Sequence, residues 1–303
     1  MTLPLDTPPA RRVPTASRLV WEQRDGRFTR HPDELAVEEP LEVRVVGLDP
    51  ASARPEVLTV TMRTPGADFE LAVGWLLSEG VLAGPGDLRA VRYCTDPELD
   101  AEQRYNVVTV DLEPAAGARL AAAGGFPSRL TTTSSSCGVC GSSSIAALSE
   151  RLRAPVRSTR VFALADVVGW PSLLGGGQTG FAATGGLHAA GLVSATGELL
   201  VAREDIGRHN AVDKVLGWAT LQAVAGYLDL PLDEVGLVVS GRTSFEIVQK
   251  ALAAGIPIVA GVSAASSLAV RLADERGITL LGFVRGGRGI VYSHPERLEP
   301  AGP

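Results

Sequence analysis

The feature that most constrains this chain is an alternation of strand and helix patterns in its last third. Three short apolar runs, bounded by small or polar residues, have the composition of fully buried strands: GLVVS (236–240), PIVAG (257–261) and ITLLGF (278–283). Helix patterns lie between them, over 244–254 and 265–276. Strands that alternate with helices in this way form a parallel sheet covered by helices. This part of the chain is therefore predicted to be α/β.

The first part of the chain has a different organisation. Residues 41–62 alternate apolar and polar side chains on both sides of a proline-containing turn, which predicts a strand pair. An amphipathic pattern over 68–82 then predicts a helix that ends at glycines. Two more strands are predicted over 88–93 and 106–112. Together these elements predict a small α+β unit.

A segment poor in large apolar residues separates the two parts. Residues 121–144 are rich in glycine, serine and threonine, so we place a domain boundary near 128–131. Beyond it the sequence predicts helices over 144–153 and 164–174 and a hairpin with strands 188–193 and 198–202. The prediction is therefore a disordered tail over 1–16, a small N-terminal α+β domain over 17–130, and an α/β domain over 131–303.

Composition limits the possible partners and compartments. A chain of 303 residues with 45% hydrophobic residues can fill a sizeable core, and no apolar stretch is long enough to span a membrane. The net charge of −6 argues against bulk attraction to nucleic acid, so any phosphate site must be built locally. Three cysteines are too few for a disulfide-stapled secreted protein of this length. We expect a soluble protein of the reducing cytoplasm that binds neither nucleic acid nor membrane.

Two of the cysteines, Cys137 and Cys140, lie three positions apart among glycines and serines. A thiolate whose pKa is lowered at a helix N-terminus is a good nucleophile that can accept sulfur as a persulfide, and Ser142–Ser144 opens such a helix. Half of a zinc site is one alternative, but a closed site needs four ligands and only Cys94 and four scattered histidines remain. A dithiol redox pair is another, although no thioredoxin-like strand precedes it. We expect no metal held by protein ligands.

A second group of reactive side chains, REDIGRHNAVDK, occupies 203–214. The pattern predicts a helix that begins near Gly207. The purely structural interpretation is a capped helix start, in which Asp205 is the cap and Asp213 and Lys214 are solvated, and it explains half of the segment. Such a helix start leaves Arg208, His209 and Asn210 crowded into the first turn, where backbone N–H groups favour an anion.

The loops after the three parallel strands form a third group. In an open α/β sheet, ligands bind outside the carboxyl ends of the strands, so these loops are expected to converge. Small residues there give a ligand access to backbone N–H groups, and Arg242, Arg285 and Arg288 can pair with phosphate oxygens. Neither a Walker A loop nor a GxGxxG follows a strand. The loops together predict a phosphorylated, nucleotide-like ligand and comprise 240–244, 261–264 and 283–288.

These groups belong to a series of ordered motifs that resembles the FdhD/NarQ family over roughly residues 17–298. The motifs are TTTSSSCGVCG (131–141), GLHAAGL (186–192), REDIGRHNAVDKVLG (203–217), SGRTSFEIVQKA (240–251), GVSAASSLA (261–269) and GFVRGGR (282–288). The resemblance implies a small N-terminal domain followed by a cytidine-deaminase-like, three-layer α/β domain.

The resemblance also implies a function. A cysteine desulfurase would pass sulfur to the CxxC loop, and the chain would pass it on to molybdenum (or tungsten) in a bis-guanine-dinucleotide pterin cofactor that a formate dehydrogenase receives. Cys137 matches the persulfide-forming cysteine and Cys140 its partner. A homodimer is likewise implied by the resemblance alone. The residues that match the cofactor-binding motif are Phe283, Val284, Arg285, Gly286, Gly287 and Arg288.

Two other functions compete with sulfur transfer. A zinc-dependent deaminase carries Pro-Cys-x-x-Cys and an upstream His-x-Glu, whereas here Ser136 precedes Cys137 and the only upstream histidine is the distant His31. A binding module that holds the cofactor without moving sulfur stays open, because its loops would have the same sequence features. Asp205 or Glu204 is expected to bind a guanine edge, an assignment that rests on carboxylate chemistry alone.

Overall fold

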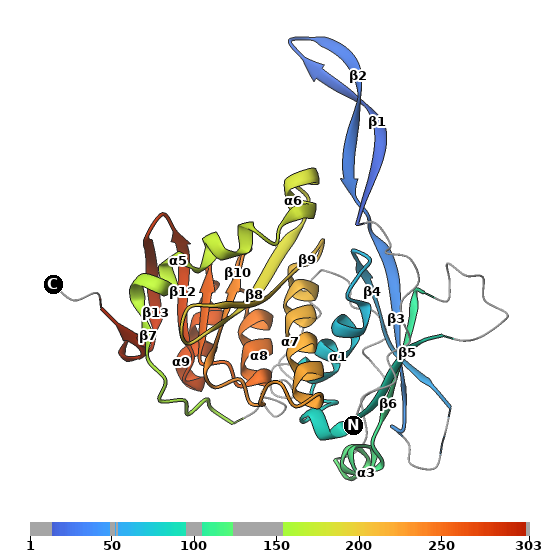
Figure 1. Cartoon of the computed structure of the whole chain (residues 1–303), viewed down its shortest axis with the longest axis vertical. Coiled ribbons are helices and arrows are strands. Elements are labelled where there is room, and N and C mark those ends of the chain that lie inside the picture. Colours follow the sequence, from blue (N-terminus) through green and yellow to red (C-terminus); the bar gives the residue numbers. More distant parts are fainter. Residues whose placement is uncertain (1–13, 49–51, 53, 95–104, 124–153, 301–303) are drawn as a thin grey trace.

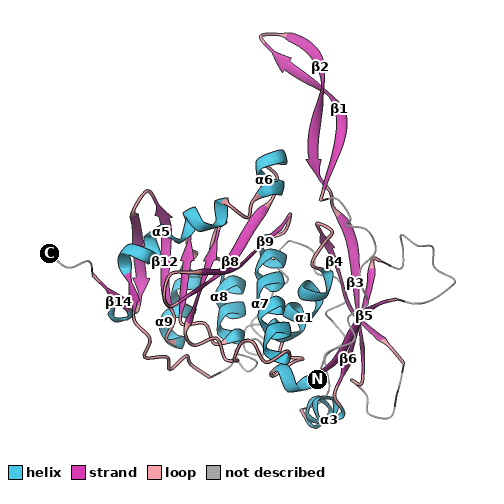
Figure 2. Ribbon diagram, viewed as in Figure 1, coloured by secondary structure: helices cyan, strands magenta, loops and turns pink. Residues whose placement is uncertain are grey.

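The computed structural model describes residues 14–48, 52, 54–94, 105–123 and 154–300 (Figures 1 and 2). Most of them belong to two sheets with helices between and beside them. The boundary predicted near 128–131 and the helix predicted over 144–153 lie outside these residues, so both stay predictions.

The larger sheet has the order β13-β12-β11-β10-β8-β9 within the described residues. Strands β10, β11 and β12 pair in parallel, as the alternation of strands and helices predicts, and the other three are antiparallel to their neighbours. The elements of this part are β8 (His188–Ser194), β9 (Leu199–Asp205), α7 (Arg208–Val224), β10 (Val235–Val239), α8 (Phe245–Ala254), β11 (Ile258–Gly261), α9 (Ser267–Arg276), β12 (Thr279–Arg285) and β13 (Arg288–Ser293).

Helices cover both faces of this sheet. Val238, Ala260 and Leu281 pack on one face with Trp170 of α5 (Leu164–Gly175). Their chain neighbours Leu237, Val259 and Leu280 point to the other face and pack with α7, α8 and α9. Because successive side chains of a strand alternate between faces, an apolar run needs cover on both sides. The result is a three-layer α/β arrangement, while the cytidine-deaminase likeness stays a prediction.

The smaller sheet has the order β4-β3-β6-β5 and confirms the strands expected in the first part of the chain. Its helix α1 ends at Ser78, earlier than the expected residue 82, and the backbone N–H of Glu79 closes the last turn on Trp75 and Leu77. The elements are β3 (Glu39–Val46), β4 (Glu56–Arg63), α1 (Asp68–Ser78), β5 (Leu88–Tyr93), β6 (Val107–Leu112) and α3 (Pro114–Ala122), with short 3-10 turns at Pro85–Asp87 and Pro295–Arg297.

Two glycines let α1 and α7 cross in close contact. A Cβ atom at Gly74 would lie 1.8 Å from the carbonyl oxygen of Asp213, and one at Gly217 would lie 1.7 Å from that of Glu70. No side chain fits at either position. The helices therefore meet backbone to backbone, and one continuous apolar core runs from the small sheet through α1 and α7 to the large sheet.

The structure adds elements that the sequence analysis did not predict. Strands β1 (Thr15–Arg24) and β2 (Arg27–Ala36) form a hairpin that stands away from the body (Figure 1), so the predicted tail ends before Thr15. Short strands β7 (Phe162–Ala163) and β14 (Leu298–Glu299) pair beside the large sheet, and helix α6 (Thr179–Thr184) lies near the base of the hairpin.

Candidate functional site

The three loops after the parallel strands lie side by side, as expected. Thr243 donates its N–H to the carbonyl oxygen of Ala264 at 3.0 Å and accepts from the N–H of Ser266 at 3.0 Å. Phe283 donates its N–H to the carbonyl oxygen of Ser263 at 3.0 Å. The carboxyl ends of β10, β11 and β12 therefore form one continuous edge.

Antiparallel pairing brings a further strand pair to the same edge. Strand β8 runs opposite to β10, so that its first residue, His188, lies where β10 ends. His188 pairs with Asp205, the last residue of β9, and α7 starts three residues later at Arg208. The N-termini of α7 and α8 thus open at the edge where the three loops meet.

A cluster of basic side chains occupies this edge, and we call His188, Arg208, His209 and Arg242 the basic cluster. Burial lowers the pKa of His188 first, and the charges of Arg208, His209 and Arg242 lower it further, whereas Asp205 opposes them. A Cβ atom at Gly241 would lie 3.3 Å from Nδ1 of His188 and 3.5 Å from Cδ of Arg208. The side chains of His188 and Arg208 therefore both border position 241, where glycine leaves room for them.

The basic cluster has the properties of an anion site. Arg208 Nε is buried and has no hydrogen-bond partner among the described residues. Arg242, in contrast, is an exposed residue. Backbone N–H groups at a helix N-terminus add partial positive charge. Arginine suits phosphate because its N–H groups match two phosphate oxygens at once. Phosphate is therefore the ligand chemistry that this edge fits best.

The carboxylate of Asp205 holds this edge in place. It forms a buried ion pair with Lys214 at 2.7 Å and accepts hydrogen bonds from the N–H groups of Thr64 at 3.1 Å and Gly207 at 2.9 Å. Asn210 donates to the same carboxylate at 3.0 Å and to the carbonyl oxygen of Met62 at 2.8 Å. The segment 203–214 therefore joins the start of α7 to the end of β4.

Three expectations for this segment are wrong. Gly207, and not Asp205, is the N-cap residue of α7, and no side chain caps the helix. Asp213 and Lys214 are buried and not solvated, because α1 packs along this side of α7. The expectation that Asp205 binds a guanine edge is wrong as well, because this carboxylate is fully buried and engaged by the contacts above. Each carboxylate oxygen of Glu204 accepts one N–H, from Gly180 or Phe181, at 2.8 Å, and a role of Glu204 toward guanine stays a prediction.

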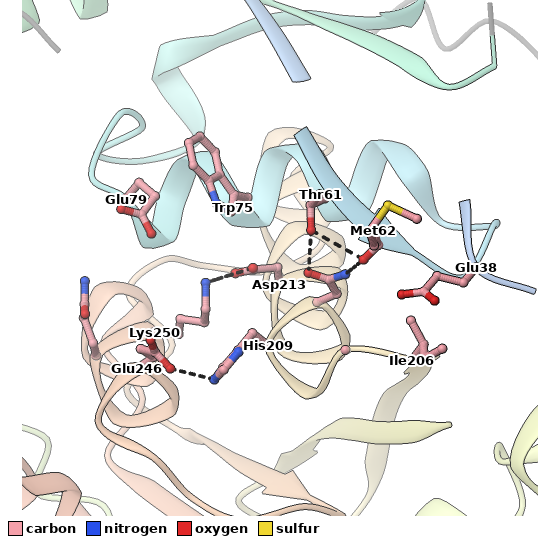
Figure 3. Close-up of a pocket in the computed structure, with 13 residues that line it drawn as sticks. Glu38, Thr61, Met62, Trp75, Glu79, Ile206, His209, Asp213, Glu246 and Lys250 are labelled. Atoms are coloured by element: carbon pink, nitrogen blue, oxygen red, sulfur yellow. Dashed lines mark hydrogen bonds and ion pairs between the residues drawn. The ribbon is translucent and has the colours of Figure 1, made fainter. Parts of the chain in front are cut away.

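A cavity of about 420 Å³ adjoins the basic cluster between the two sheets (Figure 3). His209 pairs with Glu246 at 2.8 Å, and this hydrogen bond holds the pKa of Glu246 below its usual value. Deeper in, Lys250 donates to both oxygens of Asp213 at 2.8 Å, and Ser78 donates to the same carboxylate at 2.7 Å. The cavity walls therefore combine apolar surface with charged side chains that are mostly paired already.

The segment 283–288 is the end of one strand, a turn and the start of the next, and not a loop alone. Arg285 and Arg288 pair across Gly286 and Gly287, whose φ angles of 60° and 73° are those of a tight turn that glycine adopts without strain. Phe283 is exposed beside Ser263, whereas Val284 is buried among the residues that pack on α5. As a fully buried residue, Val284 presents no exposed surface to a ligand.

Cys137 and Cys140 lie outside the described residues. Among the residues that the structure does describe, no cluster of three histidine, cysteine or acidic side chains has the arrangement of a metal site. Within the same residues, no helix is both long and apolar enough to cross a membrane.

Sequence analysis missed His188 and the cavity-lining side chains of α8. His188 stands at the start of an apolar strand, and only the antiparallel pairing of β8 with β10 brings it beside Arg208 and Arg242. The sequence feature that could have indicated this basic cluster was the crowding of Arg208 and His209 at the start of α7.

Comparison with known proteins gives a consistent result. The chain is 45% identical over 285 residues to "Sulfur carrier protein FdhD" of Nocardia farcinica, covering 94% of this chain and 95% of the relative. It is 47% identical over 289 residues to the protein of that name from Streptomyces coelicolor, with the same coverage.

A solved structure supports the fold. The crystal structure of a candidate formate dehydrogenase accessory protein from Desulfotalea psychrophila superposes with a TM-score of 0.69 at 22% identity, covering 94% of this chain and 99% of that one. A family model described as "FdhD/NarQ family" matches residues 36–299, so the chain belongs to the FdhD/NarQ family.

Proposed function

We propose that this chain is a sulfur carrier that serves a formate dehydrogenase. It accepts sulfur from a cysteine desulfurase and delivers it to the molybdenum of a bis-guanine-dinucleotide pterin cofactor, which is its cargo. Two findings support the proposal. The chain belongs to the FdhD/NarQ family and its relatives are named sulfur carrier proteins.

The observation that carries the proposal for the cargo is the basic cluster. The guanine dinucleotide arms of such a cargo carry phosphates, and the described part of the chain offers Arg208 with a buried unpartnered N–H, Arg242, and two helix N-termini at one edge. On a chain with a net charge of −6, this local arrangement is what makes an anionic cargo acceptable. Phe283 and the turn over 285–288 border the same edge and would extend the contact.

The sulfur step is a displacement at sulfur. The thiolate of Cys137 attacks the terminal sulfur of the desulfurase persulfide, the S–S bond breaks, and the desulfurase cysteine leaves as a thiolate. Cys137 then carries the persulfide. For release, the thiolate of Cys140 attacks the inner sulfur of Cys137, so that sulfide departs toward the cargo and a Cys137–Cys140 disulfide remains, which a cellular dithiol reduces.

The partners and compartment follow from this chemistry. The chain must meet a cysteine desulfurase and a formate dehydrogenase, and the thiols that accept sulfur stay reduced in the cytoplasm, where we place the protein. We also propose that two copies of the chain form a homodimer.

The test is sulfur uptake. We expect incubation with a cysteine desulfurase and cysteine to add the mass of one sulfur atom to Cys137, as measured by intact-protein and peptide mass spectrometry. Cys137→Ala should abolish uptake, Cys140→Ala should accept sulfur but retain it, and Cys94→Ala should behave as the unmodified chain does. An unchanged mass in a chain that still binds GDP would favour a non-catalytic cofactor-binding module and refute sulfur transfer.

A further inference from the structure

His188 lies in the basic cluster without a hydrogen-bond partner. No described residue bonds its imidazole ring, which is affected only by burial and by the charges of its neighbours. Its backbone is fixed, because β8 pairs with β9 on one side and with β10 on the other, and Asp205 is its direct partner on β9. The strands therefore hold the residue in place while the ring can still take up a proton or bind a ligand.

The charged groups that act on His188 come from three neighbouring elements. Arg208 and His209 belong to the first turn of α7, Arg242 follows β10, and Asp205 is the last residue of β9. Three of these four side chains are basic. The ring therefore lies in surroundings that are mainly cationic.

The carboxylates at this edge are already engaged. Asp205 forms its buried ion pair with Lys214 at 2.7 Å. Glu246 is held by the imidazole of His209 at 2.8 Å. Neither of these two carboxylates is left to stabilise a positive charge on His188.

An empty site favours the neutral form of His188. Nδ1 of His188 and Cδ of Arg208 lie 3.3 and 3.5 Å from one point, the position of a Cβ atom at Gly241. A protonated ring would add a positive charge beside that guanidinium, whose Nε is buried and has no hydrogen-bond partner in the described part of the chain. Like charges repel more strongly in a partly buried site than in water, and together with burial they lower the pKa of His188.

A bound diphosphate would reverse this balance. A diphosphate arm of the proposed cargo carries about two negative charges, and an opposite charge within about 4–6 Å of an ionisable group favours its charged form. A protonated imidazole donates from both nitrogens, so it can bind a phosphate oxygen by a charge-assisted hydrogen bond. The anion therefore supplies the counter-charge that the protein does not offer to His188.

We propose that His188 takes up one proton from solvent when a diphosphate arm of the cargo binds at the basic cluster, and that the resulting imidazolium donates a hydrogen bond to a phosphate oxygen. The inference rests on the proposed function, because it needs the anionic cargo, but it does not depend on sulfur transfer. The extra positive charge is present only when the ligand compensates it. His188 is thus a binding residue that favours a phosphate over a neutral ligand and makes binding tighter as the pH falls.

The test needs a ligand whose own charge does not change with pH. The terminal phosphate of GDP loses its last proton near about pH 6, so the charge of GDP changes in the range of interest. GDP-mannose is a diester of diphosphate, as the arms of the proposed cargo are, and it keeps its charge between about pH 5 and pH 8. Any pH dependence of its binding therefore comes from the protein.

The first measurement follows the histidines directly. The chain has four, His31, His188, His209 and His294, so carbon-13 labelling of their rings gives four NMR signals, and His188→Gln identifies that of His188. Saturation with GDP-mannose should raise the pKa of His188, while His31 and His294 serve as references outside the basic cluster. An unchanged or lowered pKa of His188 in the saturated chain would overturn the inference, and so would a rise confined to His209.

The second measurement is the dissociation constant of GDP-mannose, obtained by calorimetry from pH 5.5 to 8. In the unmodified chain it should rise with pH, by up to about tenfold per unit between the pKa values of His188 in the empty and filled sites. His188→Gln should weaken binding at the acid end and flatten the dependence. His188→Lys keeps a permanent charge and should bind with little pH dependence, and His294→Gln should behave as the unmodified chain does.

These results separate the inference from the proposed function. If GDP-mannose bound at no pH, both the anionic cargo and the role of His188 would be refuted. If it bound with the same pH dependence in the unmodified chain and in His188→Gln, the cargo would stand and the inference alone would be overturned. Sulfur uptake by Cys137 is measured independently of either result.

Discussion

Asp205 and Lys214 form an ion pair of 2.7 Å in which both side chains are buried, and through it the start of α7 is joined to the end of β4. Lys214 also donates to the carbonyl oxygens of Thr64 and Glu204 at 2.9 and 3.1 Å. One charged pair thus connects the small sheet to the edge that carries the basic cluster.

Loss of Lys214 should strongly destabilise the protein. Lys214→Met leaves Asp205 buried without its counter-charge, which costs about 3–5 kcal/mol of unfolding free energy. Arg24→Met removes a cation from the exposed pair with Glu22 and should cost less than about 1 kcal/mol. Urea unfolding of both variants measures the difference, and a similar midpoint for the two would show that the buried pair is not needed.

The crossing of α1 and α7 should not tolerate a methyl group. Gly74→Ala places a Cβ atom 1.8 Å from a backbone oxygen, so the helices must separate, and we expect a loss of several kcal/mol or failure to fold. Gly169→Ala in α5 meets no atom within 4 Å and should raise stability by about 0.4–1 kcal/mol. Thermal unfolding compares the two, and equal melting temperatures would contradict the close approach.

Two histidines should make opposite contributions to the pH dependence of stability. Burial and neighbouring cations lower the pKa of His188 in the folded state, so below pH 6.5 the unfolded chain binds a proton that the folded chain does not. Stability then falls with decreasing pH in the window below 6.5, and His188→Gln should make this fall shallower.

The pKa of His294 is shifted in the opposite direction, so this residue serves as the control. A hydrogen bond to the carbonyl oxygen of Asp274, followed by one with Glu296, raises the pKa of His294. Its contribution is present below pH 6.5 and is lost as pH rises through the raised folded-state value. His294→Gln should therefore remove the gain in unfolding free energy that appears as the pH falls toward 6.5 from above. Unfolding free energies between pH 5 and 7.5 would refute the assignment if both variants changed the slope in one direction.

The basic cluster should control affinity for GDP, a fragment of the proposed cargo. Arg208→Gln and Arg242→Gln each remove a charge-assisted hydrogen bond of about 1.5–3 kcal/mol, so we expect the dissociation constant to rise about tenfold or more. Arg157→Gln, an exposed change beside the end of α9, should leave it unchanged. Isothermal calorimetry measures all three.

The same titration locates the phosphates. Arg285→Ala and Arg288→Ala should also weaken binding if the β12–β13 turn reaches the ligand, as the sequence motif indicates. Loss of affinity in these two variants alone would place the phosphates at the turn and refute the role proposed for the basic cluster.

The β1–β2 hairpin and strand β13 were not predicted, and they show where sequence patterns become weak. WEQRDGRFTR carries an Asp-Gly turn signal between β1 and β2, but most side chains of the hairpin are polar, so no apolar alternation marked its strands. Gly286-Gly287 likewise preceded β13, an edge strand whose first residues are exposed. The buried strands β10, β11 and β12 were predicted within one or two residues, because burial on both faces requires an unbroken apolar run.

The amino-acid sequence by itself determined much of the local structure of this protein: the strands and helices that pack in the two main sheets, the parallel pairing of β10, β11 and β12, and the small residues and arginines that follow their carboxyl ends. These features depend on side-chain periodicity and backbone preference, which act between near neighbours in the chain. Only the tertiary structure decided that His188 meets Arg208 and Arg242, that Asp205 is bound internally, and that Trp21 and Phe28 stay exposed on the β1–β2 hairpin. Those outcomes depend on strand order and on helix contacts between residues far apart in the chain. The sequence pattern of a single segment predicts neither of them.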